Sequence, residues 1–340
     1  KTMRRTWFQK IRMILTLTCE QSSRLVSDSQ EREPGIGASG ESFIIMEFWR
    51  YTMKLRMPPN ARTTAHSVEG ALVRIGGGTG CLHPWEELGD PSLDDQLVAL
   101  KTGNDTGMTR QCRYCCALDA AARSRGTSIF ADVEIPSSHG IWFEGVEEAR
   151  LENLEFLKMK CGPDVVAEAA RLKEVVVRLP EARWRIDFNA TLDRDSFLAW
   201  RDALGVDLLE KIDLVEDPMP IDAGSWDELQ AEVPFDLAAD REKNPARVKV
   251  VKPLLDEVDT GASNCLVTSY MDHPIGQCFA ALIASRFSEP LRGSGLLTHW
   301  LFEDDPFVER MRDSHGVLLA PEGTGLGFDD LLDDLPWKTL

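Results

Sequence analysis

No stretch of this sequence stays apolar over the roughly 20 residues that a membrane-spanning helix needs, so a membrane segment is not expected. Positive charge is scarce, because 38 Lys and Arg face 56 Asp and Glu, which gives a formal net charge of −18. Nucleic-acid backbones demand clustered Lys and Arg, so this balance argues against a nucleic-acid partner. Cysteine is sparse as well. The eight cysteines are irregularly spaced, which favours reduced thiols in a cytosolic protein over a disulfide framework.

What is present is a chain of 340 residues, 43% hydrophobic and 28% charged, typical of a soluble globular protein with one large or two ordinary domains. Its first residues are basic, but the apolar stretch behind them spans only about six residues, short of a signal peptide; a weak export signal is the alternative. The polar stretch that follows has no periodicity and predicts a disordered extension over residues 1–45. Met46 opens the first strand-like run and is a candidate functional start.

Two β-runs between residues 46 and 75 and two helices within 91–126 form the first part of the predicted fold. From residue 139 to about 300, strands alternate with helices, which implies parallel pairing and an α/β barrel. The strand-like runs are SHGIWFEG, LEFLKMK, RWRIDF, IDLVE, PFDLAAD, RVKVVKP, CLVTSY and, closing the series, GLLTHWLF. The C-terminal tail is Gly-rich and then acidic, and we expect it to pack back onto the N-terminal part.

Charged side chains stand at the C-terminal ends of consecutive runs, and residues two apart on a strand share a face. Lys158 and Lys160 therefore point the same way, as do Arg185, Asp187 and Asn189. In a barrel of parallel strands these ends form one rim, where such barrels carry their chemistry. The spacing predicts that these side chains face one pocket.

The next runs continue the pattern with Glu216, Asp240 and Lys252. Lys252 shares its face with Val250 and Val248, so apolar side chains are expected to fill the barrel below the charged rim. Three carboxylates from successive strands suit a Mg²⁺ ion that keeps open positions for substrate. Such a cation, flanked by lysines, predicts a site that removes a proton next to a carboxylate.

The base would be a lysine, whose ordinary pKa of about 10.4 is too high for work near neutrality. A second ammonium two residues away, at roughly 6.5–7 Å, lowers that pKa. The repulsion is about 2.4 kcal/mol at an effective dielectric near 20, which is a little under two pKa units. Lys160, with Lys158 as its neighbour, is therefore a candidate base.

These residues resemble the enolase superfamily, in its muconate-lactonizing branch, and within it most closely the o-succinylbenzoate synthase family. The resemblance implies a modified TIM barrel, (β/α)7β, behind an N-terminal α+β capping domain. It implies Lys160 as acid/base, Lys158 as its Lys-x-Lys partner, Lys252 as the opposite lysine, and a Mg²⁺ site (Mn²⁺ as substitute) at Asp187, Glu216 and Asp240. The implied boundaries are an extension over 1–45, a cap over 46–135, a barrel over 136–305 and a C-terminal segment over 306–340.

The implied activity is the dehydration of a succinyl-substituted cyclohexadiene carboxylate to o-succinylbenzoate in menaquinone biosynthesis. Other members of the superfamily leave alternatives: dipeptide epimerase, N-acylamino acid racemase or cycloisomerase, and, from another class, an inactive barrel that acts as a binding protein. A cytoplasmic enzyme with a small-molecule carboxylate substrate is expected, as a monomer or homo-oligomer. The candidate substrate contacts are Asn189, Arg185, Ser269, Arg62, His66 and Asp272.

Other patterns have plainer explanations. Cys112, Cys115 and Cys116 fall on one helical face with Asp119, and no second pair stands at zinc-ligand spacing, so a core-facing stripe is expected. RIGGGTG follows a strand but precedes no helix, which favours a hairpin turn over a dinucleotide loop.

Overall fold

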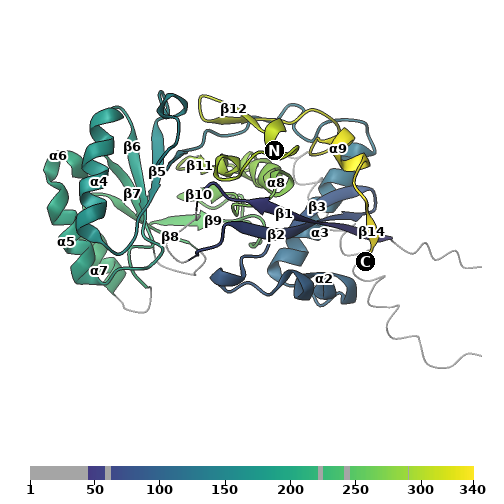
Figure 1. Ribbon diagram of the computed structural model, residues 1–340, viewed down its shortest axis with the longest axis horizontal. Coiled ribbons are helices and arrows are strands. Elements are labelled where there is room, and N and C mark those ends of the chain that lie inside the picture. Colours follow the sequence, from purple (N-terminus) through teal and green to yellow (C-terminus); the bar gives the residue numbers. More distant parts are fainter. Residues whose placement is uncertain (1–44, 58–62, 221–224, 241–245, 290) are drawn as a thin grey trace, which may run out of the picture. The chain divides into compact units, whose positions relative to one another are not determined.

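The computed structural model describes residues 45–57, 63–220, 225–240, 246–289 and 291–340 (Figure 1). The predicted N-terminal extension lies outside these residues except for its last position, so its disorder stays a prediction. Among the described helices, none combines the length and apolar character required to cross a membrane.

A four-stranded antiparallel sheet is formed by the N-terminal region and the end of the chain. The strands β1 (Met46–Lys54), β2 (Ser67–Ile75), β3 (Gly78–Leu82) and β14 (Lys338–Thr339) have the order β14-β1-β2-β3. The turn between β2 and β3 contains Gly76 and Gly77, both at positive φ, which only glycine adopts freely. The RIGGGTG segment is therefore a hairpin turn, as predicted. The pairing of β14 with β1 places the tail on the N-terminal sheet.

Helices α2 (Leu93–Thr102) and α3 (Gly107–Arg123) belong to the same region, and α3 lies directly against β3. A Cβ on Gly78 would come within 2.0 Å of the backbone oxygen of Cys116, so glycine is needed for this close approach. Cys112, Cys115 and Cys116 are buried free thiols that face the sheet. The predicted core stripe is confirmed.

Eight parallel strands form the second sheet, in the order β11-β10-β9-β8-β7-β6-β5-β4. They are β4 (Gly140–Trp142), β5 (Phe156–Lys160), β6 (Arg183–Asp187), β7 (Ile212–Glu216), β8 (Asp236–Ala239), β9 (Val248–Val251), β10 (Cys265–Thr268) and β11 (Ser294–Gly295). A bridge between Ser138 and Ser294 joins the two edges of the sheet. The predicted α/β barrel with an N-terminal α+β region is confirmed.

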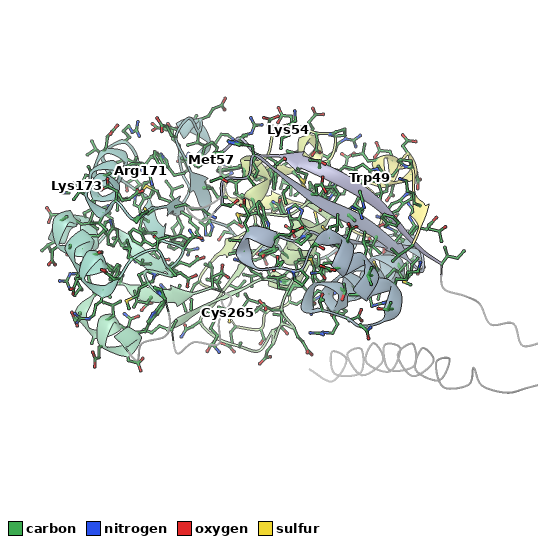
Figure 2. All side chains as sticks on the ribbon, turned by 60° about the horizontal axis from the view of Figure 1, so that its bottom comes forward. Trp49, Lys54, Met57, Arg171, Lys173 and Cys265 are labelled. Atoms are coloured by element: carbon green, nitrogen blue, oxygen red, sulfur yellow. The ribbon has the colours of Figure 1, made fainter. Side chains whose placement is uncertain are left out.

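Helices α4 (Val165–Arg178), α5 (Arg194–Leu204), α6 (Val206–Leu209) and α7 (Ser225–Glu232) cover the outside of strands β5 to β8 (Figure 1), and α8 (Pro274–Ala284) follows β10. Asp164 and Asp193 begin α4 and α5, and each carboxylate accepts a hydrogen bond from the backbone N–H three residues ahead. Arg171 of α4, labelled in Figure 2, donates to the backbone oxygen of Lys160 at 2.7 Å. This contact ties the helix to the C-terminal end of β5.

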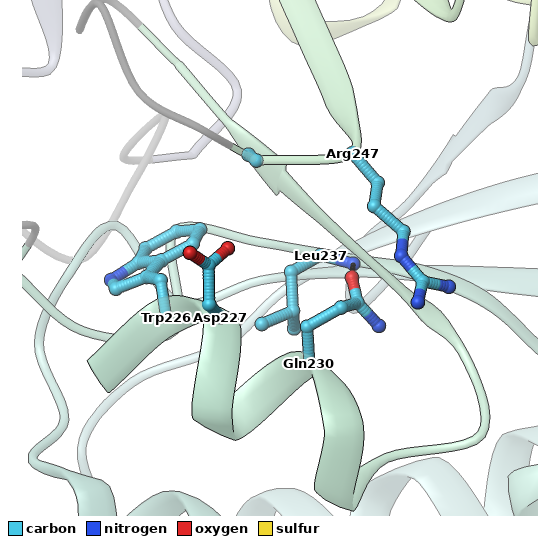
Figure 3. A pocket seen from close by; sticks show the side chains of 6 residues that line it. Trp226, Asp227, Gln230, Leu237 and Arg247 are labelled. Carbon is cyan, nitrogen blue, oxygen red and sulfur yellow. Dashed lines mark hydrogen bonds between the residues drawn. The ribbon is translucent and has the colours of Figure 1, made fainter. Parts of the chain in front are cut away.

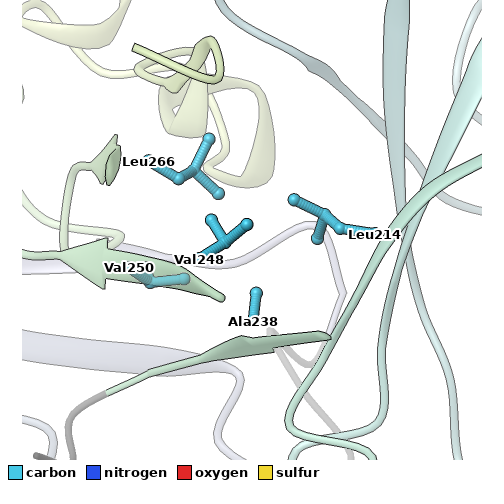
Figure 4. Close-up of a cluster of buried hydrophobic side chains, with 5 residues drawn as sticks. All are labelled: Leu214, Ala238, Val248, Val250 and Leu266. Atoms are coloured by element: carbon cyan, nitrogen blue, oxygen red, sulfur yellow. The ribbon is translucent and has the colours of Figure 1, made fainter. Parts of the chain in front are cut away.

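Apolar side chains fill the barrel beneath its rim (Figure 4). The cluster consists of Leu214, Ala238, Val248, Val250 and Leu266. These residues alternate along their strands with outward-facing ones, and Lys249 is exposed between its two buried valine neighbours. The predicted alternation on this strand is confirmed.

The closing strand differs from the prediction. Only Ser294–Gly295 pairs with β10, and Thr298–Leu301 forms a 3-10 helix, η3, so His299 and Trp300 do not end a strand. The GLLTHWLF run is buried throughout, and a continuous apolar run does not distinguish a strand from a buried helical turn.

The connection between β8 and β9 is short, since β8 ends at Ala239 and β9 begins at Val248, and residues 241–245 within it lie outside the described part. A pocket of about 130 Å³ lies beside this connection (Figure 3). Its lining residues are Trp226, Asp227, Gln230, Leu237, Ala246 and Arg247. Leu237 is the neighbour of the inward Ala238, so this pocket lies on the outside of the barrel and away from the charged rim.

Candidate active site at the carboxyl ends of the barrel strands

The strand register brings the predicted charges together at one rim. Lys160 pairs with Asp187 across β5 and β6, and Asp187 pairs with Glu216 across β6 and β7. Asp240 follows the last residue of β8, and Lys252 follows that of β9. Because β5 and β9 lie four positions apart in a barrel of eight strands, Lys160 and Lys252 come from opposite sides of the barrel.

Lys158 is an ammonium held between two carboxylates. Its Nζ lies 2.9 Å from Oδ2 of Asp187 and 2.7 Å from Oε2 of Glu216. Burial by itself would lower the pKa of Lys158, but the two carboxylates outweigh it and hold that pKa above its ordinary value. Lys158 therefore stays charged and cannot act as a base near neutrality.

Lys160 has a different environment, although it is only two residues away. Its Nζ donates to the Sδ atom of Met271 at 3.4 Å, and a thioether is a weak acceptor. Burial, opposed by Asp187 and assisted by the ammonium groups of Lys158 and Lys252, lowers the pKa of Lys160 to about 8. The two lysines of one strand thus have opposite shifts, and only Lys160 can lose its proton in the working pH range.

Lys252 forms an ion pair with Oδ2 of Asp240. Its Nζ also lies 5.5 Å from the ring centroid of Tyr270, within cation–π range. The ammonium of Lys252 thus has two contacts, one with a carboxylate and one with an aromatic ring.

Two of the three carboxylates have pKa values that are shifted in opposite directions. The pKa of Glu216 is raised by burial and by the negative charges of Asp187 and Asp240. The pKa of Asp187 is lowered, since Lys158 and Lys160 outweigh the effect of burial. Within the described part of the chain, no three His, Cys, Asp or Glu side chains already stand together as a metal-ligand group. Lys158 and Lys252 form ion pairs with these carboxylates.

The donor set nevertheless fits a hard divalent cation. Asp187, Glu216 and Asp240 offer carboxylate oxygens from adjacent strand ends, the ligand type that Mg²⁺ prefers. Oδ1 of Asp240 is buried and accepts no hydrogen bond from any described residue. Binding of such a cation would require Lys158 and Lys252 to yield part of their ion pairs with these carboxylates.

The structure adds a fourth carboxylate to the rim. Asp217 has a positive φ of 42°, and its Oδ1 accepts a hydrogen bond from the backbone N–H of Asp240 at 3.1 Å. Burial and the charges of Asp240, Glu216 and Asp187 raise the pKa of Asp217 to about 8. Its position directly after Glu216 was the only available signal, because strand alternation would have turned it away from the rim.

Asn189 and Ser269, two predicted substrate contacts, lie close to the strand ends. The backbone N–H of Asn189 donates to Oδ1 of Asp187 at 3.0 Å, and Ser269 contacts the hydroxyl of Thr298. Asp272 is fully buried, and neither carboxylate oxygen has a hydrogen-bond partner in another described residue. Burial raises the pKa of Asp272 to about 8.

His66 is exposed in the segment before β2, and Arg62 lies outside the described residues. Among the described interactions, no side-chain contact joins His66 to the rim. Both substrate contacts stay predictions.

Arg185 lies below the rim and is held by protein groups. Its guanidinium forms a buried ion pair with Asp213 at 2.9 Å and reaches Nδ1 of His139 at 3.1 Å. At this point the register of β6 and β7 shifts as in a bulge, because Trp184 pairs with Ile212 and Arg185 with Leu214, which leaves Asp213 as the extra residue between them. The predicted contact of Arg185 with substrate stays a prediction, but its described partners are structural.

The model of the o-succinylbenzoate synthase N-terminal domain family matches residues 46–122. An o-succinylbenzoate synthase of Bdellovibrio bacteriovorus is 32% identical over 321 residues, which cover 85% of this chain and 97% of that protein. The described fold is also similar to solved structures. A substrate-liganded L-Ala-D/L-Glu epimerase from Bacillus subtilis has a TM-score of 0.68 at 19% identity, covering 84% of this chain and 98% of that one.

A dipeptide epimerase from Enterococcus faecalis V583, complexed with Mg and L-Leu-L-Tyr, has a TM-score of 0.67 at 16% identity, with 84% and 99% of the two chains covered. The muconate lactonizing enzyme from Pseudomonas fluorescens, complexed with muconolactone, has a TM-score of 0.65 at 16% identity, with 84% and 95% covered. At these identities the likeness concerns the fold, which is that of a capped barrel.

Proposed function

The chain belongs to the o-succinylbenzoate synthase family and is a lyase, and we propose that it dehydrates 2-succinyl-6-hydroxy-2,4-cyclohexadiene-1-carboxylate to o-succinylbenzoate with the aid of Mg²⁺. The observation that carries the proposal is the contrast between Lys160 and Lys252. The two come from opposite sides of one barrel rim, the first with a pKa lowered to about 8 and the second held as an ion pair with Asp240.

In the proposed reaction the neutral amine of Lys160 removes the proton from the carbon that bears the substrate carboxylate. The electron pair of the broken C–H bond moves into the carboxylate as an enediolate. It then returns to form the ring double bond while the C–O bond of the hydroxyl breaks. Lys160 gives its proton to the departing hydroxyl, and water leaves. One lysine thus acts first as base and then as acid, and the aromatic ring is the product.

The charged lysines would serve the enediolate. Lys252, on the opposite side, would place its ammonium near the developing negative charge. A positive charge already oriented there lowers the activation free energy of the reaction. Lys158 would balance part of the charge of Asp187 and Glu216 through its two ion pairs until the cation binds.

Asp187, Glu216 and Asp240 would hold the Mg²⁺ ion, with Mn²⁺ as a substitute of similar ligand preference. When bound, the divalent cation supplies positive charge that opposes the charge developing on the substrate carboxylate. Oδ1 of Asp240, which is buried without a described partner, supports this assignment.

The remaining assignments complete the proposal. Residues 46–135 would be the cap, 136–305 the catalytic barrel and 306–340 a segment that returns to the cap. The substrate, a small carboxylate, would contact Asn189, Arg185, Ser269, Arg62, His66 and Asp272. A cytoplasmic location agrees with the free thiols of the seven described cysteines. The protein would act as a monomer or a homo-oligomer.

Dipeptide epimerisation is the alternative that the structural neighbours support. An epimerase of this fold would need an acidic group after the last strand to grip the substrate's ammonium, and Glu303, Asp304 and Asp305 follow it here. Asp304 forms an ion pair with Arg56 at 2.6 Å, and Asp305 accepts hydrogen bonds from two backbone N–H groups. Two of these three acids are therefore engaged, which favours the dehydratase.

The purified protein should be assayed with the cyclohexadiene substrate and with a dipeptide panel, each with and without Mg²⁺. We expect Mg²⁺-dependent formation of o-succinylbenzoate. Epimerisation of dipeptides without dehydration would overturn the proposal in favour of the alternative, and no turnover of either would favour a binding protein.

Lys160→Ala tests the chemical role directly. We expect turnover to fall by at least about 100-fold, because the general base is lost, while the circular dichroism spectrum stays unchanged. Lys173→Ala, which removes an exposed lysine of α4 labelled in Figure 2, is the matched control and should keep full activity. Dehydration by Lys160→Ala near the wild-type rate would refute the role.

A further inference from the structure

The loop between β10 and α8 contacts both rim lysines through consecutive residues. Met271 accepts the hydrogen bond of Lys160, and the ring of Tyr270 faces the Nζ atom of Lys252. Met271 has a positive φ of 52°, an unusual conformation for a residue with a side chain. This backbone turn lets neighbouring side chains reach opposite sides of the rim.

Tyr270 is held on both its backbone and its hydroxyl. Its backbone oxygen accepts a hydrogen bond from Nε1 of Trp85 at 3.0 Å, and its hydroxyl donates to Oδ2 of Asp90 at 2.8 Å. The same Asp90 oxygen accepts from the backbone N–H of Trp85 at 2.8 Å. Only 1% of Tyr270 is exposed. The ring is thus fixed by a segment that follows β3 of the N-terminal sheet.

A fixed ring can fix an ammonium. The negative face of an aromatic ring attracts a cation within about 6 Å of its centroid, and the attraction strengthens where water is excluded. Lys252 has a flexible four-carbon side chain. Its ion pair with Asp240 alone would leave the position of Nζ poorly restrained. Asp240 would in addition share its charge with a bound cation. Tyr270 offers a second contact that does not compete for metal ligands.

We propose that Tyr270 is a positioning residue for the dehydration, which holds the ammonium of Lys252 at the rim and links it to the segment Trp85–Asp90. The inference rests on the proposed function. It assigns to one side chain two separable parts: the ring positions Lys252, and the hydroxyl anchors the ring to Asp90.

Two substitutions separate the parts. Tyr270→Phe keeps the ring, and we expect kcat within about threefold of the wild-type value. Tyr270→Leu removes the ring, and we expect kcat to fall about tenfold while KM changes less than about threefold, since a cation–π contact in a desolvated site has that magnitude. Thermal unfolding of both variants controls for stability. Equal kcat values for the Tyr270→Phe and Tyr270→Leu variants would overturn the positioning role. That result would mean that the aromatic ring contributes nothing to kcat.

The hydrogen bond from the Tyr270 hydroxyl to Asp90 is tested by protein stability and not by activity. A double-mutant cycle of Asp90→Ala and Tyr270→Phe compares unfolding in urea, and we expect the double variant to lose less stability than the sum of the single variants. Strict additivity would overturn the anchor. A wild-type protein that dehydrates nothing would overturn the proposed function, whereas active wild type with equal Phe and Leu variants overturns the role of Tyr270 alone.

Discussion

The ammonium of Lys158 on β5 donates to Oε2 of Glu216 on β7 at 2.7 Å, across the strand that lies between them. The same ammonium is 2.9 Å from Asp187 on that middle strand. One lysine therefore forms ion pairs with two of the three proposed metal ligands. Its own charge is stabilised in return, which leaves Lys160 as the lysine that can be neutral.

This relationship predicts competition between Lys158 and Mg²⁺ for the same oxygens. Glu216→Gln removes a charged ligand and should weaken Mg²⁺ binding at least about tenfold. Lys158→Met removes the competing ammonium and should strengthen it. Isothermal titration calorimetry measures both, with Glu174→Gln, an exposed carboxylate on α4, as the control that leaves affinity unchanged. Unaltered affinity in Glu216→Gln would rule out this carboxylate as a ligand.

The pH profile should report the lowered pKa of Lys160. Its folded pKa of about 8 lies below the ordinary lysine value, so the neutral base is lost as pH falls through about 8. We expect kcat/KM to rise with pH and to level off above that pKa, and a bound cation would move the rise to lower pH.

Replacing Met271 should shift this profile. Met271→Gln places an amide oxygen, a stronger acceptor than the thioether, beside the ammonium of Lys160. Because the charged form gains a hydrogen bond, the pKa of Lys160 should rise and the profile should move to higher pH. Met271→Leu has no acceptor and is the matched control. An upward shift in the Leu variant equal to that of the Gln variant would contradict the argument.

A substitution of Arg185 tests whether its buried guanidinium stabilises the fold or contacts the substrate. Arg185→Met removes the buried partner of Asp213 and should destabilise the protein by about 3 kcal/mol, even though Arg292 remains at 3.0 Å from Asp213. Urea unfolding measures the loss. If Arg185 is purely structural, KM at a temperature where the variant is folded should stay within about twofold. A large rise in KM with unchanged stability would instead support the substrate contact.

Asp272 makes stability depend on pH. Its folded pKa is raised to about 8, above the value near 4 of an unfolded aspartate, so the folded state keeps a proton that the unfolded state has lost. The stabilising effect of that proton is complete below about pH 4 and is lost as pH rises to about 8.

Asp272→Asn should remove this dependence, so its free energy of unfolding should gain on the wild type between pH 4 and 8. Denaturant titrations over that range measure the difference, with Asp207→Asn, an exposed aspartate of α6, as the control. Parallel pH curves for Asp272→Asn and the wild type would show that the carboxyl is not protonated in the folded protein.

The rim was predictable from the sequence because a strand has a period of two and parallel strands share a carboxyl edge. Lys160, Asp187, Glu216 and Lys252 could be placed together on these two rules alone. The closing strand could not be placed in this way, since residues 295–302 are buried throughout and lack the alternation that marks a strand.

The sequence by itself determined the α/β barrel and the set of charges at its rim, because both follow from local periodicity and chain order. Only the tertiary structure decided which lysine keeps its proton, since that depends on distances to carboxylates on other strands and on burial. It also decided the surroundings of Arg185, through a bulge on β7, and the contact of Tyr270 with Lys252, through a loop turned by Met271. These features arise between distant segments, where no local pattern reports them.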